Sequence, residues 1–232
     1  MIAAEGRKWE SLRAYKKGLM QQLFPRDGES VPQLRFPKFR KAGEWELRRL
    51  SDFISERSEM ASADIPLFSL TIDAGVTAKT ERYERSFLVT DESDAYKVVL
   101  PNDFAFNPMN LRFGAIARHS GQHPVSLSKY YNIFRCDRSV DSHFCHVYFR
   151  SDPMVALYDR IATGSLIEKR RVHFDRFLKL DIRFPKLAEQ QRIAACLSSL
   201  EEQIAAQSRK IESLKQHKKG LMQQLFPSAG EG

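Results

Sequence analysis

The 232-residue sequence contains no run of about eighteen apolar residues, and it does not start with the basic-then-apolar pattern of a signal peptide. We therefore expect a soluble, cytoplasmic protein with no membrane partner. Its three cysteines, Cys136, Cys145 and Cys196, have no paired spacing. Such cysteines are typical of free thiols in a reducing compartment, so the sequence predicts no disulfide framework.

Patterns of common catalytic centres are also missing. There is no Gly-rich phosphate loop, no H-E-x-x-H and no G-x-S-x-G. The acids Asp91, Glu92 and Asp94 stand in a Ser/Asp-rich stretch that is typical of a solvated loop. Asn107-Pro108-Met109-Asn110 lacks the second proline and the aromatic residue of an amino-methyltransferase loop, and it predicts a turn between strands. We therefore expect a non-catalytic chain without a cofactor.

One group of residues, Cys136, His143, Cys145 and His146, contains metal-binding residue types. However, His143 and Cys145 alternate with their neighbours as on the two faces of a strand, and no C-x-x-C accompanies them. Structural zinc sites use stricter spacings. We therefore expect no metal here.

Positive charge is in excess, with 37 Lys and Arg against 29 Asp and Glu, a formal net charge of +8. Many of the basic residues lie between positions 111 and 183. Neutralisation of phosphates supplies much of the affinity of proteins for DNA, so this distribution favours a duplex partner. A solvated basic face is the alternative that composition alone leaves open.

The strongest pattern is an internal repeat. Residues 2–25 (IAAEGRKWESLRAYKKGLMQQLFP) return at an offset of 202 as residues 204–227 (IAAQSRKIESLKQHKKGLMQQLFP), and 18 of the 24 positions are identical. The identity includes outward positions such as Lys17/Lys219 and Gln21/Gln223, which a shared core pattern does not require. Either the duplication is recent, or both copies present the same surface to a partner.

The second copy lies in a longer helical pattern that starts near Glu189. Apolar residues recur there in alternating steps of four and three, the a and d spacing of a coiled coil. The expected pairing residues are Ile193, Leu197, Leu200, Ile204, Ile211, Leu214, Leu221 and Leu225, with Leu12, Leu19 and Leu23 in the first copy. The polar interruptions Gln207 and Lys218 favour one specific pairing. A helix over 189–226 would be about 55 Å long, so it needs a partner.

Both copies of the helix are expected to stop before a proline, Pro25 and Pro227. Gly18 and Gly220 each cost roughly 1 kcal/mol inside a helix, unless something packs closely there. The first copy also starts late, because Met1 aligns with residue 203. We therefore expect one period of an array of the form helix, domain, helix, domain.

The central residues predict a mixed domain of helices and strands. Residues 27–43 are rich in proline, glycine and charge, which indicates a linker. Trp45, Leu47, Leu50 and Phe53 are expected to open the folded domain. The expected strands cover 66–72, 96–100, 111–117, 130–136 and 177–184, and a helix covers 152–162.

Several segments resemble the specificity subunits of type I restriction-modification systems. Residues 184–193 (FPKLAEQQRI) are similar to the P-x-x-x-E-Q-x-x-I start of that family's long conserved helix, and residues 214–227 (LKQHKKGLMQQLFP) to its end. Asn107-Pro108-Met109 with Gly114-Ala115-Ile116, residues 126–134 (SLSKYYNIF), and Gly164 before a basic segment are similar to its target-recognition domain.

The resemblance implies an α+β fold with one mixed α/β target-recognition domain, residues 26–186. An N-terminal conserved helix (1–25) and a long C-terminal one (187–227) would flank it and form an antiparallel coiled coil, with a tail at 228–232. Family members read double-stranded DNA without catalysis of their own. They recruit methyltransferase (modification) subunits and a restriction subunit, and the assembled complex is a methyltransferase and an ATP-dependent endonuclease.

Family members typically carry two target-recognition domains, whereas this sequence has one. We therefore expect a half-subunit that pairs with a second copy as a homodimer through the long helices. A coiled-coil scaffold that binds protein without DNA specificity is the alternative. DNA binding that is lost steeply with increasing salt would favour the DNA-recognition subunit. Salt-insensitive protein binding without DNA binding would favour the scaffold.

The candidate DNA contacts are basic and polar side chains in the expected loops, because Arg and Lys pair with guanine edges and Tyr reaches phosphate. These residues are Arg82, Arg85, Arg118, Lys129, Tyr130, Lys169, Arg170, Arg171 and His173.

Overall fold

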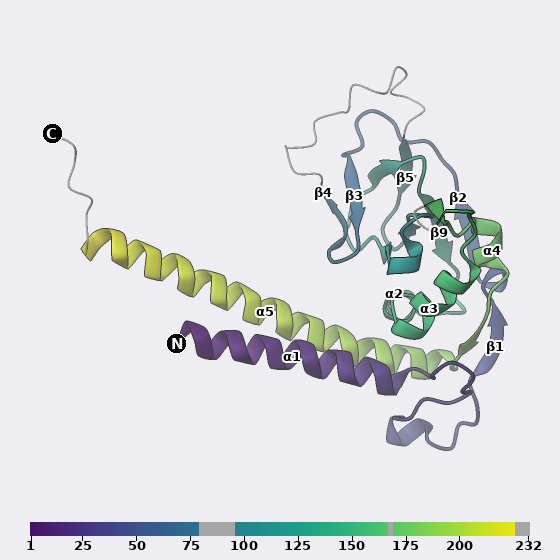
Figure 1. Ribbon diagram of the computed structural model, residues 1–232, viewed down its shortest axis with the longest axis horizontal. Helices are drawn as coiled ribbons and strands as arrows, with labels where there is room; N and C mark the ends of the chain where they lie inside the picture. Colours follow the sequence, from purple (N-terminus) through teal and green to yellow (C-terminus); the bar gives the residue numbers. More distant parts are fainter. Residues whose placement is uncertain (79–95, 167–168, 226–232) are drawn as a thin grey trace.

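The computed structural model describes residues 1–78, 96–166 and 169–225. Figure 1 shows two helices side by side, with a domain of strands and short helices at one end of the pair. Helix α1 (Ile2–Leu23) is the first element, and helix α5 (Leu187–Leu225, 39 residues) is the last. No described helix is long and apolar enough to cross a membrane.

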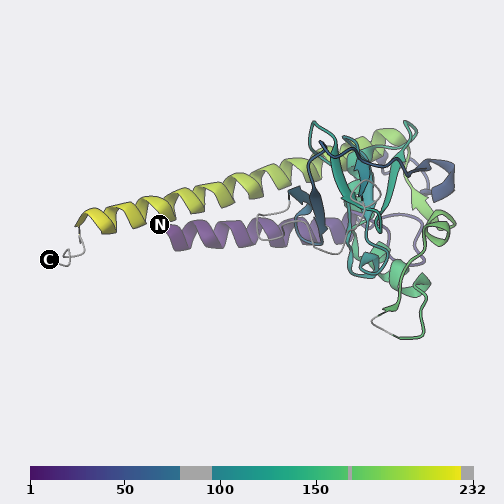
Figure 2. The same cartoon turned by 90° about the horizontal axis from the view of Figure 1, so that it is seen from above.

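The two long helices run in opposite directions. Near the start of α1, Glu5 pairs with Lys210 at 2.6 Å, and near its end Lys16 pairs with Glu201 at 2.5 Å. Helix α1 therefore covers the first part of α5, while the last part of α5 extends beyond the N-terminus of the chain (Figures 1 and 2).

Polar residues hold the start of α5 against the domain. Arg35 in the linker donates to both carboxylate oxygens of Glu189, each at 2.7 Å, and both side chains are almost fully buried. The Gln190 amide donates to the Pro185 carbonyl and accepts from the Asp141 backbone N–H, both at 2.8 Å. The E-Q pair of the motif therefore connects the helix to the linker and to the domain.

The strands are short, and the pairings between the described strands are antiparallel, with one isolated parallel bridge between Leu67 and Ser126. Four of them form the main sheet in the order β2-β9-β6-β7: β2 (Ile54–Arg57), β9 (Asn132–Cys136), β6 (Phe104–Phe106) and β7 (Ile116–Arg118). Among the described residues, three further pairs are formed: β1 (Glu46–Arg49) with β10 (Asp181–Phe184), β3 (Phe68–Thr71) with β4 (Gly75–Ala78), and β5 (Tyr96–Val99) with β8 (Val125–Ser128).

The remaining helices are α2 (Ser142–Tyr148), α3 (Asp152–Ile161) and α4 (Phe174–Leu178), with 3₁₀ turns at Pro37–Phe39, Leu50–Asp52 and Leu111–Phe113. The main core is aromatic: Phe104 stacks on Phe134 at 5.1 Å between ring centroids, and Phe24, just after α1, stacks on Tyr148 at 5.1 Å. Because Leu23 and Phe24 are both 1% exposed, the end of α1 is part of the domain core.

Most of the expected elements are confirmed with shorter bounds: β3, β5, β9, α3 and the long helix α5 lie where the sequence predicts them. The turn at Asn107–Asn110 is also confirmed, since Asn110 N–H donates to the Asn107 carbonyl at 3.1 Å. Helix α1 ends at Leu23, where extended backbone at Phe24 precedes Pro25.

Two expected strands are partly wrong. The 111–117 segment begins with a 3₁₀ turn, and Gly114 leaves this turn in the left-handed conformation, φ +87°, before β7. The 177–184 segment starts inside α4, because Phe174, Phe177 and Leu178 have helical spacing and pack on the core.

The expected strand around His143 and Cys145 is wrong. Asp141 caps helix α2 there by accepting the Phe144 N–H at 2.8 Å, and Phe144, Val147 and Tyr148 have the spacing of one buried helical face. Leu47, one of the residues expected to open the folded domain, is 59% exposed.

No close packing explains the two helical glycines. A Cβ on Gly18 or Gly220 would meet no atom within 4 Å in the described chain.

Candidate nucleic-acid interface

The Asn107–Asn110 turn follows β6 directly and holds a fixed shape. The Asn107 side chain accepts the Met109 N–H at 3.0 Å, and the Asn107 carbonyl accepts the Leu111 N–H at 2.8 Å. Because Phe106 of β6 pairs with Asn132 of β9, this turn lies beside the residues that precede β9.

The turn before β9 carries Lys129, Tyr130 and Tyr131. Tyr131 hydrogen-bonds to the Asn107 side chain; burial raises the pKa of Tyr131, and this hydrogen bond opposes the rise. The ammonium group of Lys97 donates to the Tyr131 carbonyl at 3.2 Å. Tyr131 is therefore fixed, whereas its neighbour Tyr130 is 79% exposed and Lys129 is exposed.

The third segment, Lys169–His173, lies on the same turn. Val172 N–H donates to the Pro108 carbonyl at 2.9 Å, and Arg171 exchanges two backbone hydrogen bonds of 2.9 Å with Thr163. Gly164 has φ +150°, and a Cβ there would lie 2.9 Å from the Arg170 Cα. The backbone therefore approaches itself so closely at this point that only glycine fits without movement.

We name these three segments, Asn107–Asn110, Lys129–Tyr131 and Lys169–His173, the basic end of the domain. They are far apart in the sequence and meet around one turn. The charged or polar exposed side chains are Asn110, Lys129, Tyr130, Lys169, Arg171 and His173. The apolar residues Met109 and Phe113, 44% and 54% exposed, lie in or just after the turn and were not expected at the site.

Arg170 differs from its neighbours because its side chain is bound within the domain. Its guanidinium donates to the Asp159 carbonyl at 2.5 Å and to the Ala162 carbonyl at 3.1 Å. These carbonyls belong to the C-terminal end of α3, where a cation is stabilising. Arg170 therefore supports the segment that presents Lys169 and Arg171.

Arg118 lies apart from the basic end. It pairs with Phe104, at the other end of β6 from the Asn107 turn. It lines a cavity of about 720 Å³ between the domain and the two long helices. The charged or titratable residues around this cavity are Lys16, Asp73, Arg118, His143, His146, Arg150 and Glu201.

Positive groups crowd this cavity. Burial, and then the charge of Arg150, lower the pKa of His146 to about 3, so its imidazole is neutral at pH 7. Its Nδ1 accepts the Arg118 backbone N–H at 3.2 Å. Burial also lowers the pKa of Arg118 and of Arg150.

Arg150 and the role of His146 were not predicted from the sequence. Once residues 142–148 are recognised as a helix, positions 143, 146 and 150 share one face, and this spacing could have identified both residues. Arg82 and Arg85, two further expected DNA contacts, lie outside the described residues.

The expected helix-pairing residues are unequally covered. In α5, Ile193, Leu197 and Leu200 are buried, the middle residues Ile204, Ile211 and Leu214 are half-buried, and Leu221 and Leu225 are 43% and 69% exposed. In α1, Leu12 and Leu19 are half-buried and Leu23 is buried. Burial thus falls along α5 from its start beside the domain to its last part, which extends beyond the N-terminus of α1.

The chain is similar to known proteins in two independent ways. The family model described as type I restriction modification DNA specificity domain matches residues 162–216, which contain the FPKLAEQQRI motif and most of α5. A search of curated proteins gave no match.

Solved structures of specificity subunits share the fold. The HsdS subunit from Thermoanaerobacter tengcongensis is 15% identical with a TM-score of 0.56, over 97% of this chain and 53% of that one. A type I restriction-modification S subunit from M. genitalium is 11% identical with a TM-score of 0.59, over 99% and 57%. A third structure, from work on complex assembly and conformational transition of the type I system, is 15% identical with a TM-score of 0.56, over 97% and 54%.

These comparisons confirm the resemblance to type I specificity subunits that the sequence motifs indicate. The identities are low, so the solved structures show the fold alone. The chain spans about half the length of the structures it matches.

Proposed function

We propose that this chain is the DNA-reading component of a type I restriction-modification complex and that its basic end contacts the duplex. The observation that carries the proposal is the meeting of three family-like segments around the Asn107 turn. Exposed Lys129, Lys169 and Arg171 can pair with phosphates or guanine edges, and Tyr130 can reach phosphate. The chain has no catalytic role in this proposal.

The long helices supply the contacts to other proteins in this proposal. They form an antiparallel coiled coil, two copies of the chain pair through it, and the modification and restriction subunits bind to the same conserved helices. The exposed apolar residues Leu221 and Leu225 support this arrangement, because the last part of α5 extends beyond α1. Two copies would present two basic ends to separated half-sites of one target.

Duplex binding at several salt concentrations tests the role of the basic end. Lys169→Ala with Arg171→Ala removes two exposed charges, so we expect weaker binding and a logarithmic salt slope that is shallower by about two. Arg40→Ala with Lys41→Ala removes two exposed charges in the linker and is the charge-matched control. If the double variant and the control bind DNA with equal affinity and equal slope, the basic end is not the interface.

A protein-interaction scaffold without DNA specificity would give another result in the same experiment. It would bind duplexes weakly, without preference for any sequence. Arg118→Ala asks whether the cavity beside the helices also contacts phosphate: a salt slope shallower by about one would place DNA there as well.

A further inference from the structure

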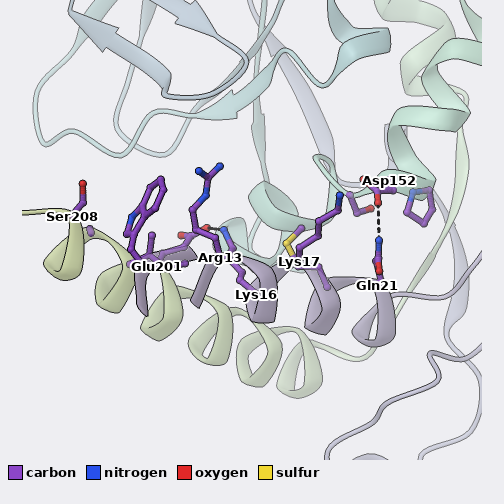
Figure 3. Close-up of a pocket in the computed structure, with 13 residues that line it drawn as sticks. Arg13, Lys16, Lys17, Gln21, Asp152, Glu201 and Ser208 are labelled. Carbon is purple, nitrogen blue, oxygen red and sulfur yellow. Dashed lines mark hydrogen bonds and ion pairs between the residues drawn. The ribbon is translucent and has the colours of Figure 1, made fainter. Parts of the chain in front are cut away.

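The unbroken run of ten identical residues in the repeat, KKGLMQQLFP (16–25 and 218–227), contacts this same chain through its first copy. Lys16 pairs with Glu201 at 2.5 Å, and the Gln21 amide donates to the Asp152 carboxylate at 3.4 Å. Figure 3 shows Gln21 pointing toward Asp152 at the start of α3. Gln21 is an outward position of the repeat, and Lys16 is the counterpart of Lys218, a polar interruption of the seam. Their identity in both copies therefore has a structural use in the first copy.

The second copy lacks these contacts. Lys218 and Gln223, the counterparts of Lys16 and Gln21, are exposed. Leu225 is 69% exposed, whereas its counterpart Leu23 is 1% exposed. In the described part of the chain, no helix lies beside this end of α5 (Figures 1 and 2). The two copies of the repeat thus have nearly the same sequence but different surroundings. The contacts of α1 show which surface binds this sequence.

We infer that α1 occupies the position that residues 204–225 of a second copy take when two chains pair. We call this position, formed by Asp152, Glu201 and Gln207, the α1 site. In a pair, Lys218 and Gln223 of the partner would meet Glu201 and Asp152, with the same residue types as in the observed contacts. The inference rests on the proposed pairing of two copies, and not on DNA binding.

The geometry of the repeat makes this exchange self-consistent. Gln207 donates to Glu5 at 2.6 Å, and these two residues are counterparts, 202 positions apart. If α5 of a second chain replaces α1, Gln207 therefore meets Gln207 of the partner subunit. A residue that contacts its own copy lies on a two-fold axis, so the pair closes with both α1 sites filled. Such a pair is closed, so it does not continue into an open filament of subunits.

Two features favour α1 over the second chain. Helix α1 is tethered to the domain, and a tethered segment has an effective concentration on the order of millimolar. In addition, Glu5 binds Lys210 at 2.6 Å, and the second copy of the repeat has glutamine at this position. Helix α1 thus acts as an internal competitor of pairing, so weakening its N-terminal contacts should promote the dimer.

Crosslinking between cysteines distinguishes the two occupants. Residues 201 and 218 lie on one continuous helix, about 25 Å apart at 1.5 Å per residue, so a short bismaleimide cannot join them within a chain. Glu201→Cys with Lys218→Cys should give a covalent dimer. Glu201→Cys with Lys16→Cys is the matched control and should crosslink within one chain. Cys136 and Cys196 are replaced by serine in both.

Adding Glu5→Lys places a positive charge beside Lys210 and weakens α1 alone. We expect the yield of the 201–218 dimer to rise several-fold, while the 16–201 crosslink falls. Absence of the dimer with and without Glu5→Lys, while the control crosslinks fully, would overturn the exchange. If sedimentation then still showed a dimer, two copies would pair through another surface, and the proposed function would stand.

A labelled peptide of residues 204–225 gives a second measurement that needs no crosslink. It should bind the Glu5→Lys chain at least about fivefold more tightly than the native chain, because α1 leaves the α1 site more readily. Equal affinity for the two chains, or no binding to either, would contradict the inference.

Discussion

Gln207 donates a hydrogen bond to its repeat counterpart Glu5 at 2.6 Å, and its side chain is 6% exposed in the middle of α5. This glutamine interrupts the apolar seam between the helices. A buried polar residue on such a seam fixes the register of the helices and the number of partners, at some cost in stability. The heptad pattern predicts that role, and the contact with Glu5 shows how it is satisfied.

Gln207→Leu should therefore loosen the specificity of helix pairing. We expect stability to change little or to rise, because leucine suits the seam, while sedimentation should show a mixture of oligomers in place of one species. Ser208→Leu, one residue further along on an exposed position, is the control and should leave the oligomeric state unchanged. A single, unaltered species for Gln207→Leu would show that the glutamine does not set the pairing.

The buried ion pair between Arg35 and Glu189 should be essential for the start of α5. Arg35→Ala leaves the Glu189 carboxylate buried without a partner, and we expect urea unfolding to show a loss of about 3–5 kcal/mol. Replacing both residues with methionine should restore much of this loss. Arg40→Ala, an exposed neighbour, should change stability by less than about 0.5 kcal/mol. A small loss for Arg35→Ala would mean that water reaches Glu189.

The neutral imidazole of His146 should make the fold sensitive to acid. The pKa of His146 is about 3 in the folded chain, whereas an unperturbed histidine, as in the unfolded chain, has a pKa of 6.5. The unfolded chain therefore binds the proton first as the pH falls. The contribution of the neutral His146 to the free energy of unfolding is fully present above pH 6.5 and declines from there toward pH 3. At pH 5 the loss is about 2 kcal/mol. His146→Gln should remove this part of the difference between unfolding at pH 7 and pH 5. An unchanged difference would rule out His146 as its source.

Gly164 should control the position of the Lys169–His173 segment. A Cβ there would lie 2.9 Å from the Arg170 Cα, so Gly164→Ala must displace the backbone. We expect a loss of stability of about 1–3 kcal/mol and weaker DNA binding. Gly18→Ala is the control: its Cβ meets no atom within 4 Å among the described residues, so it should stabilise α1 by about 1 kcal/mol. Native DNA affinity in Gly164→Ala would show that this segment does not contact DNA.

The sequence predicted the elements whose signals are local. The heptad spacing located α5, and alternating or β-branched runs located β3, β5 and β9. Helix α2 was missed because the alternation of His143 and Cys145 resembled a strand, although Asp141 is an N-cap residue and Phe144, Val147 and Tyr148 follow helical spacing. Short segments carry both patterns, and tertiary packing decides between them.

The candidate site was predicted only in part, because its residues meet through long-range contacts. The hydrogen bonds of Asn107 with Tyr131 and of Pro108 with Val172 create the basic end, and neither is visible in the sequence. Arg170 and Arg171 are adjacent residues of the same type, so the sequence alone does not distinguish their roles. The carbonyls at the end of α3 separate them, since they bind Arg170 and leave Arg171 exposed.

The most direct test of DNA reading is selection of duplexes from a random pool by the purified chain, followed by affinity measurements on the enriched sequence. We predict enrichment of one motif, with inverted half-sites if two copies pair, and a logarithm of the binding constant that decreases linearly with the logarithm of salt concentration. Lys169→Ala with Arg171→Ala should abolish the enrichment. A pool without any enriched motif, bound no more tightly than by the double variant, would contradict the account.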